Sequence, residues 1–322
     1  MNQGKTALVL GATGGIGGET AAALLRHGWK VVAMTRDPER AAAASGERLR
    51  GIAWTHGDAM VAADVLRPAQ GVDVIVHAVN PPAYRGWGEL VLPMIDSTIA
   101  AAEATGARIV LPGTVYNYGA DVPVDVAEDA PQHPATEKGR LRVELEQRLA
   151  RAVDRGGRVL IVRFGDFFGP HSGNNWFSQG LVTPGRRLAS ITYPGRRGVG
   201  HSWTYLPDAA ETIARLLDRE DDLEPYARFH AEGVWDAAGT AMVDAIARAV
   251  GRPETCVKPL PWPLFAVLGL FNETLRGLYG MRHLWRVPLR LDNRKLVAFL
   301  GEEPQTPLSI AVADTLRALE ID

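Results

Sequence analysis

The sequence predicts an α/β protein with a doubly wound parallel sheet and a smaller carboxyl-terminal lobe, and three observations lead to this prediction. Short runs rich in β-branched residues alternate with longer helical patterns over residues 1–165, as in repeated βαβ units. These runs are apolar on both faces, which is typical of parallel strands covered by helices on each side. A glycine-rich turn at residues 11–17 joins the first run to the first helical pattern.

Strands and helices can be placed along this first part of the chain. We expect strands at residues 6–10, 31–34, 52–54, 72–77, 108–111 and 159–163. Apolar residues recur every three or four positions in three longer stretches, which is the pattern of a helix with one buried face. We therefore expect helices at 16–27, 90–104 and 138–154.

The texture of the sequence changes after Arg163. Residues 164–203 are rich in glycine, proline and aromatic residues, with Pro-Gly-Arg-Arg turns at 184–187 and 194–197. A short strand between these turns, a helix after Asp208, a strand near 227–231 and a helix over 240–250 are expected. We assign residues 1–165 to the sheet domain, with a return segment near 200–230. Residues 166–322 would form mainly the smaller lobe.

Composition and charge argue against several classes of protein. The 322 residues carry a formal net charge of -2 and show no basic stripe, so neither nucleic acid nor an anionic membrane is an expected partner. Cys256 is the only cysteine, which precludes an internal disulfide, and no Cys/His cluster has zinc spacing, so no metal is expected. The longest apolar stretch, 263–270, is shorter than the about 20 residues of a membrane span. The N-terminus lacks a secretory pattern, and we expect a cytoplasmic protein.

The glycine turn has the spacing of a pyrophosphate site. The first glycine of such a turn permits the tight bend, the second lets the backbone approach the pyrophosphate, and the third lets helix and strand pack closely. The start of the following helix then offers N–H groups and a partial positive charge to the phosphates. Together these features predict a dinucleotide site on a Rossmann sheet. We expect the site to include the whole turn: Gly11, Thr13, Gly14, Gly15, Ile16 and Gly17.

The end of the second strand indicates which dinucleotide binds. A carboxylate about 20 residues past the glycines usually binds the ribose 2′-hydroxyl of NAD. Here Thr35 and Arg36 occupy that place, and the first carboxylate follows as Asp37. A guanidinium can pair with the 2′-phosphate of NADP. We therefore predict NADP(H); NAD(H) is the alternative if Arg36 is a solvated charge at a strand end.

These segments resemble the extended and atypical short-chain dehydrogenases/reductases over nearly the whole chain. GATGGIG at 11–17 resembles the glycine loop of the family, and TRDPE at 35–39 resembles the second-strand ending of NADPH-binding NmrA-like members. RFGDFFGP at 163–170 and HSWTYLPD at 201–208 resemble later segments of the family, the first leading into the substrate lobe. The resemblance implies that Asp58 approaches the adenine and that Ala78, Val79 and Asn80 lie against the dinucleotide. It also implies a homodimer through the helices at about 89–104 and 138–154.

The active-site residues depart from the pattern of this family. TVYNYG at 114–119 resembles its S/T-x-x-V-Y-G segment, so Thr114 takes the place of the substrate-binding hydroxyl. The Y-x-x-x-K-x-x-x-E of the family falls on Thr136, Arg140 and Glu144. In the family the tyrosine exchanges a proton with the substrate oxygen, while the lysine lowers the pKa of that tyrosine and holds the nicotinamide ribose. A threonine hydroxyl is a far weaker acid than a phenol of pKa about 10, so Thr136 cannot replace the tyrosine.

Neighbouring side chains offer a substitute. We hypothesise that Tyr116 supplies the proton, Thr114 orients the substrate oxygen, and Lys138 or Arg140 supplies positive charge. The alternative interpretation is that Tyr116 packs beside the sheet and that Lys138 is a solvated charge at the start of a helix.

Two groups of aromatic and amide side chains suggest a substrate pocket. Tyr84 and Trp87 follow the fourth strand at the carboxyl edge of the sheet, where ligands bind in this architecture. Asn174, Asn175 and Trp176 lie in the expected substrate segment and offer a polar and aromatic lining. A helix cap for the first group and a surface loop for the second are the alternatives.

A further apolar stripe recurs at roughly helical spacing near the end of the chain. We expect it to pack in a core or lid rather than to line a lipophilic groove. Its members are Trp262, Phe265, Leu268, Phe271 and Leu275.

These patterns predict an NADP(H)-dependent oxidoreductase, or an enzyme of epimerase or dehydratase type, acting on a small carbonyl or hydroxyl compound. The cofactor would carry the hydride chemistry, and the fold would position it. The rival is a non-catalytic regulator that binds NADP(H) and reports redox state, as the likeness to NmrA-like proteins implies. The absent Tyr/Lys pair favours the regulator, whereas the aromatic segment 164–205 favours an enzyme.

Overall fold

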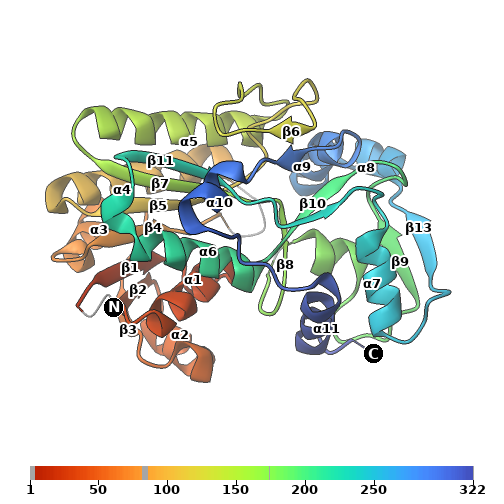
Figure 1. Cartoon of the computed structure of the whole chain (residues 1–322), viewed down its shortest axis with the longest axis horizontal. Helices are drawn as coiled ribbons and strands as arrows, with labels where there is room; N and C mark the ends of the chain where they lie inside the picture. The colour runs from red at the N-terminus through yellow and green to blue at the C-terminus, as the bar shows by residue number, and fades with distance from the viewer. Residues whose placement is uncertain (1–3, 82–85, 174, 322) are drawn as a thin grey trace. The chain divides into compact units, whose positions relative to one another are not determined.

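The computed structural model describes residues 4–81, 86–173 and 175–321 (Figure 1). The chain divides into two compact units. The first comprises Met1–Gly113, Leu141–Arg163 and Ala209–Phe229. The second comprises Thr114–Arg140, Phe164–Asp208 and His230–Asp322. Residues 114–140, which the sequence pattern places with the sheet domain, thus group with the later chain.

The first unit is built on a seven-stranded sheet of order β11-β7-β5-β4-β1-β2-β3. All of these strands except β11 pair with their neighbours in parallel: β7, β5, β4, β1, β2 and β3. The order reverses between β1 and β4, so the predicted doubly wound sheet is confirmed. The strands are β1 (Thr6–Leu10), β2 (Lys30–Thr35), β3 (Ala53–His56), β4 (Val74–His77), β5 (Arg108–Gly113), β7 (Arg158–Arg163) and β11 (Tyr226–His230).

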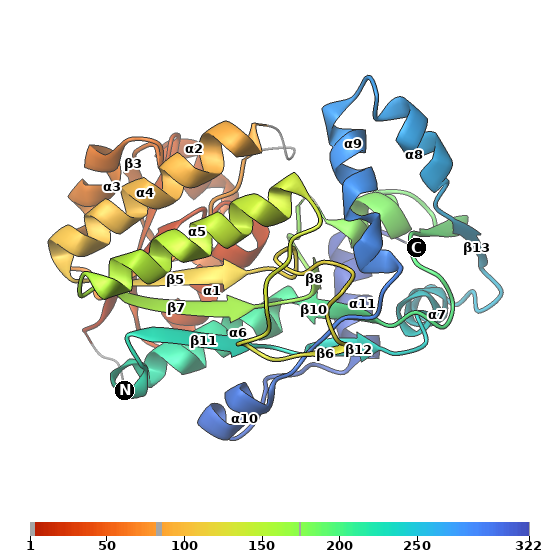
Figure 2. The same cartoon turned by 90° about the horizontal axis from the view of Figure 1, so that it is seen from above.

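Helices cover both faces of this sheet. α4 and α5 lie side by side on one face, and α1 and α6 lie on the other (Figures 1 and 2). Because both faces are covered, Ala7–Leu10 of β1 and Val74–Val76 of β4 are completely buried. The helices are α1 (Gly15–Arg26), α2 (Pro38–Ala44), α3 (Ala62–Ala69), α4 (Trp87–Thr105), α5 (Glu137–Asp154) and α6 (Leu206–Asp218).

The second unit combines small sheets with short helices. Its sheets have the strand orders β12-β10-β8, β13-β9 and β14-β6. The strands are β6 (Asp125–Val126), β8 (Asp166–Phe168), β9 (Ser190–Tyr193), β10 (His201–Tyr205), β12 (Val234–Asp236), β13 (Cys256–Pro259) and β14 (Arg290–Leu291). The helices are α7 (Ala241–Ala249), α8 (Trp262–Leu268), α9 (Glu273–Gly280), α10 (Arg294–Leu300) and α11 (Leu308–Ala318). Single helical turns span Glu47–Leu49 and Glu220–Asp222 in the first unit and Phe177–Leu181 and Met281–Trp285 in the second.

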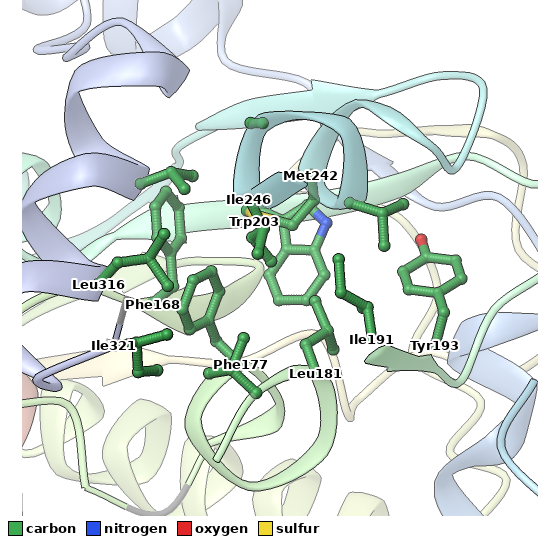
Figure 3. Packing of buried hydrophobic residues seen from close by; sticks show 14 of the residues in the cluster. Phe168, Phe177, Leu181, Ile191, Tyr193, Trp203, Met242, Ile246, Leu316 and Ile321 are labelled. Atoms are coloured by element: carbon green, nitrogen blue, oxygen red, sulfur yellow. The ribbon is translucent and has the colours of Figure 1, made fainter. Parts of the chain in front are cut away.

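An aromatic core holds the second unit together. Trp203 is completely buried and lies among side chains from β8, β9 and α7 (Figure 3). Phe168 and Phe177 stack with their ring centroids 5.8 Å apart. The Gly- and aromatic-rich segment of the sequence therefore supplies much of a core.

The apolar stripe near the end of the chain is not continuous packing, so that prediction was wrong in part. Trp262 is 8% exposed and Phe265 packs against the aromatic core, but Leu268 and Phe271 are 43% and 87% exposed. The reason is a helix break, because α8 ends at Leu268 and Asn272 caps α9. The apolar residues on the two sides of this break therefore belong to two helices and do not form one continuous face. Among the described residues, no helix is both long and apolar enough to cross a bilayer.

Candidate functional site

The turn between β1 and α1 has the backbone geometry of a phosphate cradle. Gly11 has φ +93°, in the left-handed region that favours glycine, and Gly14 N–H donates to the Gly11 carbonyl at 2.9 Å. A Cβ on Gly17 would lie 2.2 Å from the Gly11 carbonyl oxygen. A Cβ on Gly11 would lie 2.6 Å from the carbonyl oxygen of Ala78. Only glycine fits at positions 11 and 17.

The start of α1 is open to an anion. Gly14 is its N-cap, and within the described chain no side chain caps this helix and its first turn contains no carboxylate. The first N–H groups of a helix need partners from outside it, and their partial positive charge favours phosphate. Thr13 and Gly14 are exposed, while Gly15 and Ile16 are half-buried. The residues present therefore fit a bound pyrophosphate.

The end of β4 lies beside this turn. Leu10 is paired with His77, and Ala78 N–H donates to the Leu10 carbonyl at 2.9 Å. Ala78, Val79 and Asn80 thus leave the sheet where the strand order reverses, which is where dinucleotides bind in such sheets.

Arg36 follows the end of β2, and the carboxylate next to it, Asp37, takes part in a hydrogen bond with the backbone. Arg36 and Asp37 are both exposed just after Thr35. The Asp37 carboxylate accepts a hydrogen bond from Arg40 N–H at 3.0 Å and so caps α2. The Asp58 carboxylate likewise accepts from Met60 N–H at 3.0 Å, within the turn that follows β3.

The second unit contains the residues predicted to be catalytic. Thr114 and Tyr116 are half-buried, and the Thr114 hydroxyl accepts from Tyr116 N–H at 3.2 Å. Tyr118 is completely buried, with its hydroxyl 3.4 Å from Nε2 of His230. Tyr118 therefore belongs to the packing, whereas Tyr116 is the less enclosed of the two phenols.

Thr136, which the sequence pattern places at the tyrosine position of the family, caps a helix. Its hydroxyl accepts from Gly139 N–H at 3.0 Å, directly before α5 begins at Glu137. This is the geometry of a helix N-cap. A Cβ on Gly139 would lie 2.3 Å from the Tyr116 carbonyl oxygen, so this helix start packs tightly on the segment that carries Tyr116.

Lys138 is a partly enclosed amine. Burial lowers the pKa of Lys138 to about 8, although the carboxylates of Glu273 and Glu137 oppose the shift. Its ammonium therefore loses its proton not far above neutral pH. Arg140, the other predicted source of positive charge, is exposed.

The sequence reasoning missed Arg142. Its side chain is 5% exposed, its Nη2 donates to Oδ1 of Asn80 at 2.7 Å, and its guanidinium lies 5.1 Å from the centre of the Trp87 ring. Burial and the charge of Arg142 together lower the pKa of His77 to about 3. A signal was present, because Arg142 and Glu146 repeat the K-x-x-x-E spacing two residues after Arg140 and Glu144.

The predicted substrate residues have the following places. Trp87 begins α4 and is 4% exposed, under the Arg142 guanidinium. The Asn175 side chain accepts from Ser178 N–H at 2.8 Å, and Trp176 packs edge-on against Trp262 and Trp285. Tyr84 and Asn174 lie outside the described residues.

The helices through which a homodimer was expected are α4 and α5. Ion pairs join them on their outer face, between Arg148 and Asp96 and between Arg155, just past α5, and Glu103. The homodimer itself stays a prediction.

Comparison with solved structures shows which known proteins share this fold. The solved structures that share the fold include a UDP-galactose 4-epimerase, with 17% identity, a TM-score of 0.73 and 98% of both chains covered. They also include a UDP-glucose-4-epimerase from Stenotrophomonas maltophila with bound NAD and formylated UDP-arabinopyranose, with 17% identity, a TM-score of 0.75 and 98% of both chains covered. A third is a double mutant of the dTDP-glucose 4,6-dehydratase DesIV from Streptomyces venezuelae with NAD bound, with 20% identity, a TM-score of 0.73, and 97% and 96% of the chains covered.

No curated protein sequence matches the chain. A sequence model described as the NAD dependent epimerase/dehydratase family matches residues 7–230, which is more than half of the chain. The chain belongs to the NAD-dependent epimerase/dehydratase family.

Proposed function

We propose that the protein is an NADP(H)-dependent oxidoreductase, or an enzyme of epimerase or dehydratase type, that acts on a small carbonyl or hydroxyl compound. The observation that supports it most is the glycine turn, in which Gly11 and Gly17 admit no side chain and the start of α1 is uncapped. Membership of the family supports the same class of chemistry.

The dinucleotide would be held by the first unit. When bound, a nicotinamide dinucleotide donates or accepts a hydride. The turn at 11–17 and the first N–H groups of α1 would bind its pyrophosphate. Arg36 would bind a 2′-phosphate, because the adjacent Asp37 carboxylate is engaged as the cap of α2. Two of the structures compared above hold NAD, so the preference for NADP(H) is the finer part of the proposal.

The second unit would supply the proton and the charge. The Tyr116 hydroxyl would give its proton to the substrate oxygen in the direction of reduction and take it back in oxidation. The Thr114 hydroxyl would orient that oxygen. The Lys138 ammonium would lower the pKa of a nearby phenol, since a positive charge favours the phenolate.

One observation favours the second candidate, a non-catalytic NADP(H)-binding regulator. The hydroxyl of Thr136, the residue that the sequence pattern aligns with the tyrosine of the family, accepts a hydrogen bond from Gly139 N–H as a helix cap. The regulator needs the dinucleotide cradle but no proton donor. The two candidates therefore differ in turnover and agree in binding.

A turnover assay separates the two candidates. Purified protein would be incubated with NADPH or NADH and a panel of small aldehydes and ketones, while the absorbance of the reduced nicotinamide is followed. A second set of reactions with the oxidised cofactor and sugar nucleotides would be analysed for product by chromatography, because an epimerase or dehydratase returns the hydride and leaves the cofactor unchanged. For any accepted substrate we expect Tyr116→Phe to lower turnover by about 100-fold or more. The matched control is Tyr118→Phe, whose phenol packs against His230 and should leave turnover within about 2-fold. Binding of NADPH with neither its oxidation nor conversion of any sugar nucleotide would favour the regulator. Unchanged turnover of Tyr116→Phe would reject Tyr116 as the proton donor.

A further inference from the structure

Helices α8 and α9 form a hairpin that carries exposed apolar side chains. Trp262, at the start of α8, is 8% exposed, and its indole N–H donates to the Pro194 carbonyl at 2.9 Å, so this end of the hairpin is fixed to the aromatic core. Figure 2 shows the two helices leading away from β13 and returning. Beyond Trp262, five apolar side chains are 43–87% exposed, and we call them the apolar tip: Leu264, Val267, Leu268, Leu270 and Phe271.

The turn between the two helices is built by the hairpin itself. A Cβ on Gly269 would lie 3.0 Å from the Cα of Arg276, so the helices pack closely there. The Asn272 side chain accepts from Leu275 N–H at 3.1 Å and caps α9. Of the described residues within α8 and α9, only Trp262 is buried. A well-defined turn therefore presents the apolar tip outward, and contiguous exposed apolar side chains of this kind mark an interaction surface.

The part of the fold that carries this hairpin is strongly basic. β13 pairs with β9, with Lys258 beside Thr192, and so joins two segments that lie far apart in the sequence. One is 184–197, with both Pro-Gly-Arg-Arg turns, and the other is 250–289, between α7 and β14. Together they hold nine lysines and arginines against two carboxylates, a net charge of +7, so the rest of the chain carries -9. The whole-chain charge of -2 hides this separation.

Four of these cations lie on the hairpin or beside its base. All four are exposed, and within the described parts of the chain no carboxylate forms an ion pair with them: Arg196, Arg197, Lys258 and Arg276. The first two follow Pro194, whose carbonyl holds Trp262. On the hairpin itself Glu273 opposes them, but its charge also favours the protonated form of nearby Lys138 and raises the pKa of that amine. The surroundings of the apolar tip are therefore positive.

We propose that the apolar tip and the cations around it bind the surface of an anionic lipid bilayer. Leu270 and Phe271 would enter the boundary of the acyl chains, while Arg276 and Lys258 would lie among the phosphate headgroups. Apolar side chains flanked by lysine and arginine are what a segment bound at a bilayer surface presents. Nucleic acid would attract the cations but leave the apolar side chains in water, so the combination favours a bilayer. The inference goes beyond the proposed dinucleotide function and does not depend on it.

Sedimentation with lipid vesicles tests the proposal. The purified protein would be mixed with vesicles of phosphatidylcholine alone, or of phosphatidylcholine with about three parts in ten of phosphatidylglycerol. We expect binding to the anionic vesicles to be about 10-fold or more tighter than to the neutral ones, and to weaken as salt rises. Leu270→Ser combined with Phe271→Ser should weaken it by about 10-fold or more, because two apolar side chains lose their burial in lipid. The matched control is Ile310→Ser, which should bind like the unaltered protein. Ile310 is 59% exposed on α11, which lies apart from α8 and α9 in both views (Figures 1 and 2).

A charge variant tests the second half of the proposal. Arg276→Gln removes a cation next to the apolar tip and should weaken binding to the anionic vesicles by about 5-fold, with binding to the neutral vesicles unchanged. Arg317→Gln, at an exposed arginine of α11, is the matched control and should alter neither. Because all of these positions are exposed, urea denaturation should give unchanged free energies of unfolding, which separates a loss of binding from a loss of fold.

A fluorescent probe locates the contact. Cys256 is the only cysteine, so Phe271→Cys combined with Cys256→Ser takes a single environment-sensitive dye at the apolar tip. We expect the emission of this dye to shift to shorter wavelength when anionic vesicles are added, because the dye leaves water. The same dye on Ile310→Cys, again with Cys256→Ser, should not shift.

Three outcomes would overturn the proposal. The first is no binding of the unaltered protein to the anionic vesicles. The second is salt-dependent binding that persists in Leu270→Ser with Phe271→Ser, since the cations would then act without the apolar tip. The third is a dimer in analytical ultracentrifugation that these two substitutions dissociate, with no binding to vesicles, since a second copy of the chain would then cover the apolar tip.

Discussion

The glycine turn at residues 11–17 and the segment Thr114–Arg140 carry different parts of the proposed chemistry, and they are constrained in different ways. In the turn, the backbone dictates the residue, because a Cβ on Gly17 would lie 2.2 Å from the Gly11 carbonyl oxygen. In the segment, polar side chains at expected positions have structural roles: Thr136 caps α5 and Tyr118 packs against His230. Binding by backbone leaves a pattern that can be read from sequence, whereas proton transfer by a side chain can move to a neighbouring position without changing the fold.

The largest effect that could break this comparison is expected at Gly17. In Gly17→Ala the new methyl group meets the Gly11 carbonyl, so the turn must shift. We expect unfolding free energy to fall by about 1–3 kcal/mol and dinucleotide binding to become undetectable. Urea denaturation and calorimetry measure the two effects. The control is Gly173→Ala, where a Cβ meets nothing within 4 Å. Its unfolding free energy and its affinity for the dinucleotide should stay unchanged. Normal binding by Gly17→Ala would mean that the backbone of the turn is not the cradle.

The difference between the two regions also explains how much could be predicted from sequence. The parallel sheet and the glycine turn follow from patterns that are local and strict, and the structure agrees with both. Arg142 was missed because K-x-x-x-E fits α5 in two registers, starting at Arg140 or at Arg142. Side chains two positions apart point in directions about 200° apart around a helix, so the choice of register decides whether Arg140 or Arg142 faces the sheet. Only packing, through the Glu146–Arg163 pair, resolves it.

The exposure of Leu268 and Phe271 was missed for a related reason. Periodicity predicts one buried stripe from Trp262 to Leu275 if one helix runs through it. The chain instead breaks between Leu268 and Asn272, and Phe271 is left 87% exposed. The local signals of the break are Gly269 at the end of α8 and Asn272 at the start of α9, and the spacing of apolar residues does not record them.

A smaller effect at Arg36 would sharpen the account of the cradle. Arg36→Glu places a carboxylate where the 2′-phosphate would bind, so we expect NADP+ affinity to fall by about 10-fold and NAD+ affinity to hold or rise. Arg40→Glu, an exposed charge reversal nearby on α2, is the control and should alter the ratio of the two affinities little. Because Arg36 is exposed, the difference in NADP+ affinity between Arg36→Glu and the unaltered protein should shrink at high salt. An unchanged ratio would show that Arg36 is a solvated charge and would favour NAD(H).

The smallest effect concerns Lys138 and belongs to the other region. The pKa of Lys138 is lowered to about 8 from its ordinary 10.5, chiefly by burial. Between these values the unfolded chain holds a proton that the folded chain has released, so this residue makes stability rise with pH across that window. Lys138→Met should remove this rise and leave the protein slightly more stable near neutral pH, as urea denaturation at several pH values would show. Lys258→Met, at an exposed lysine, should keep the rise.

The activity profile of the same variant tells packing apart from chemistry. If the Lys138 ammonium assists the Tyr116 phenol, turnover should decline as pH rises through about 8, where that charge is lost. In Lys138→Met turnover should be lower and the decline near that pH absent. A variant that loses the stability slope but keeps the activity decline would identify Lys138 as a buried amine of the helix start, and the positive charge would then have to come from elsewhere in the chain.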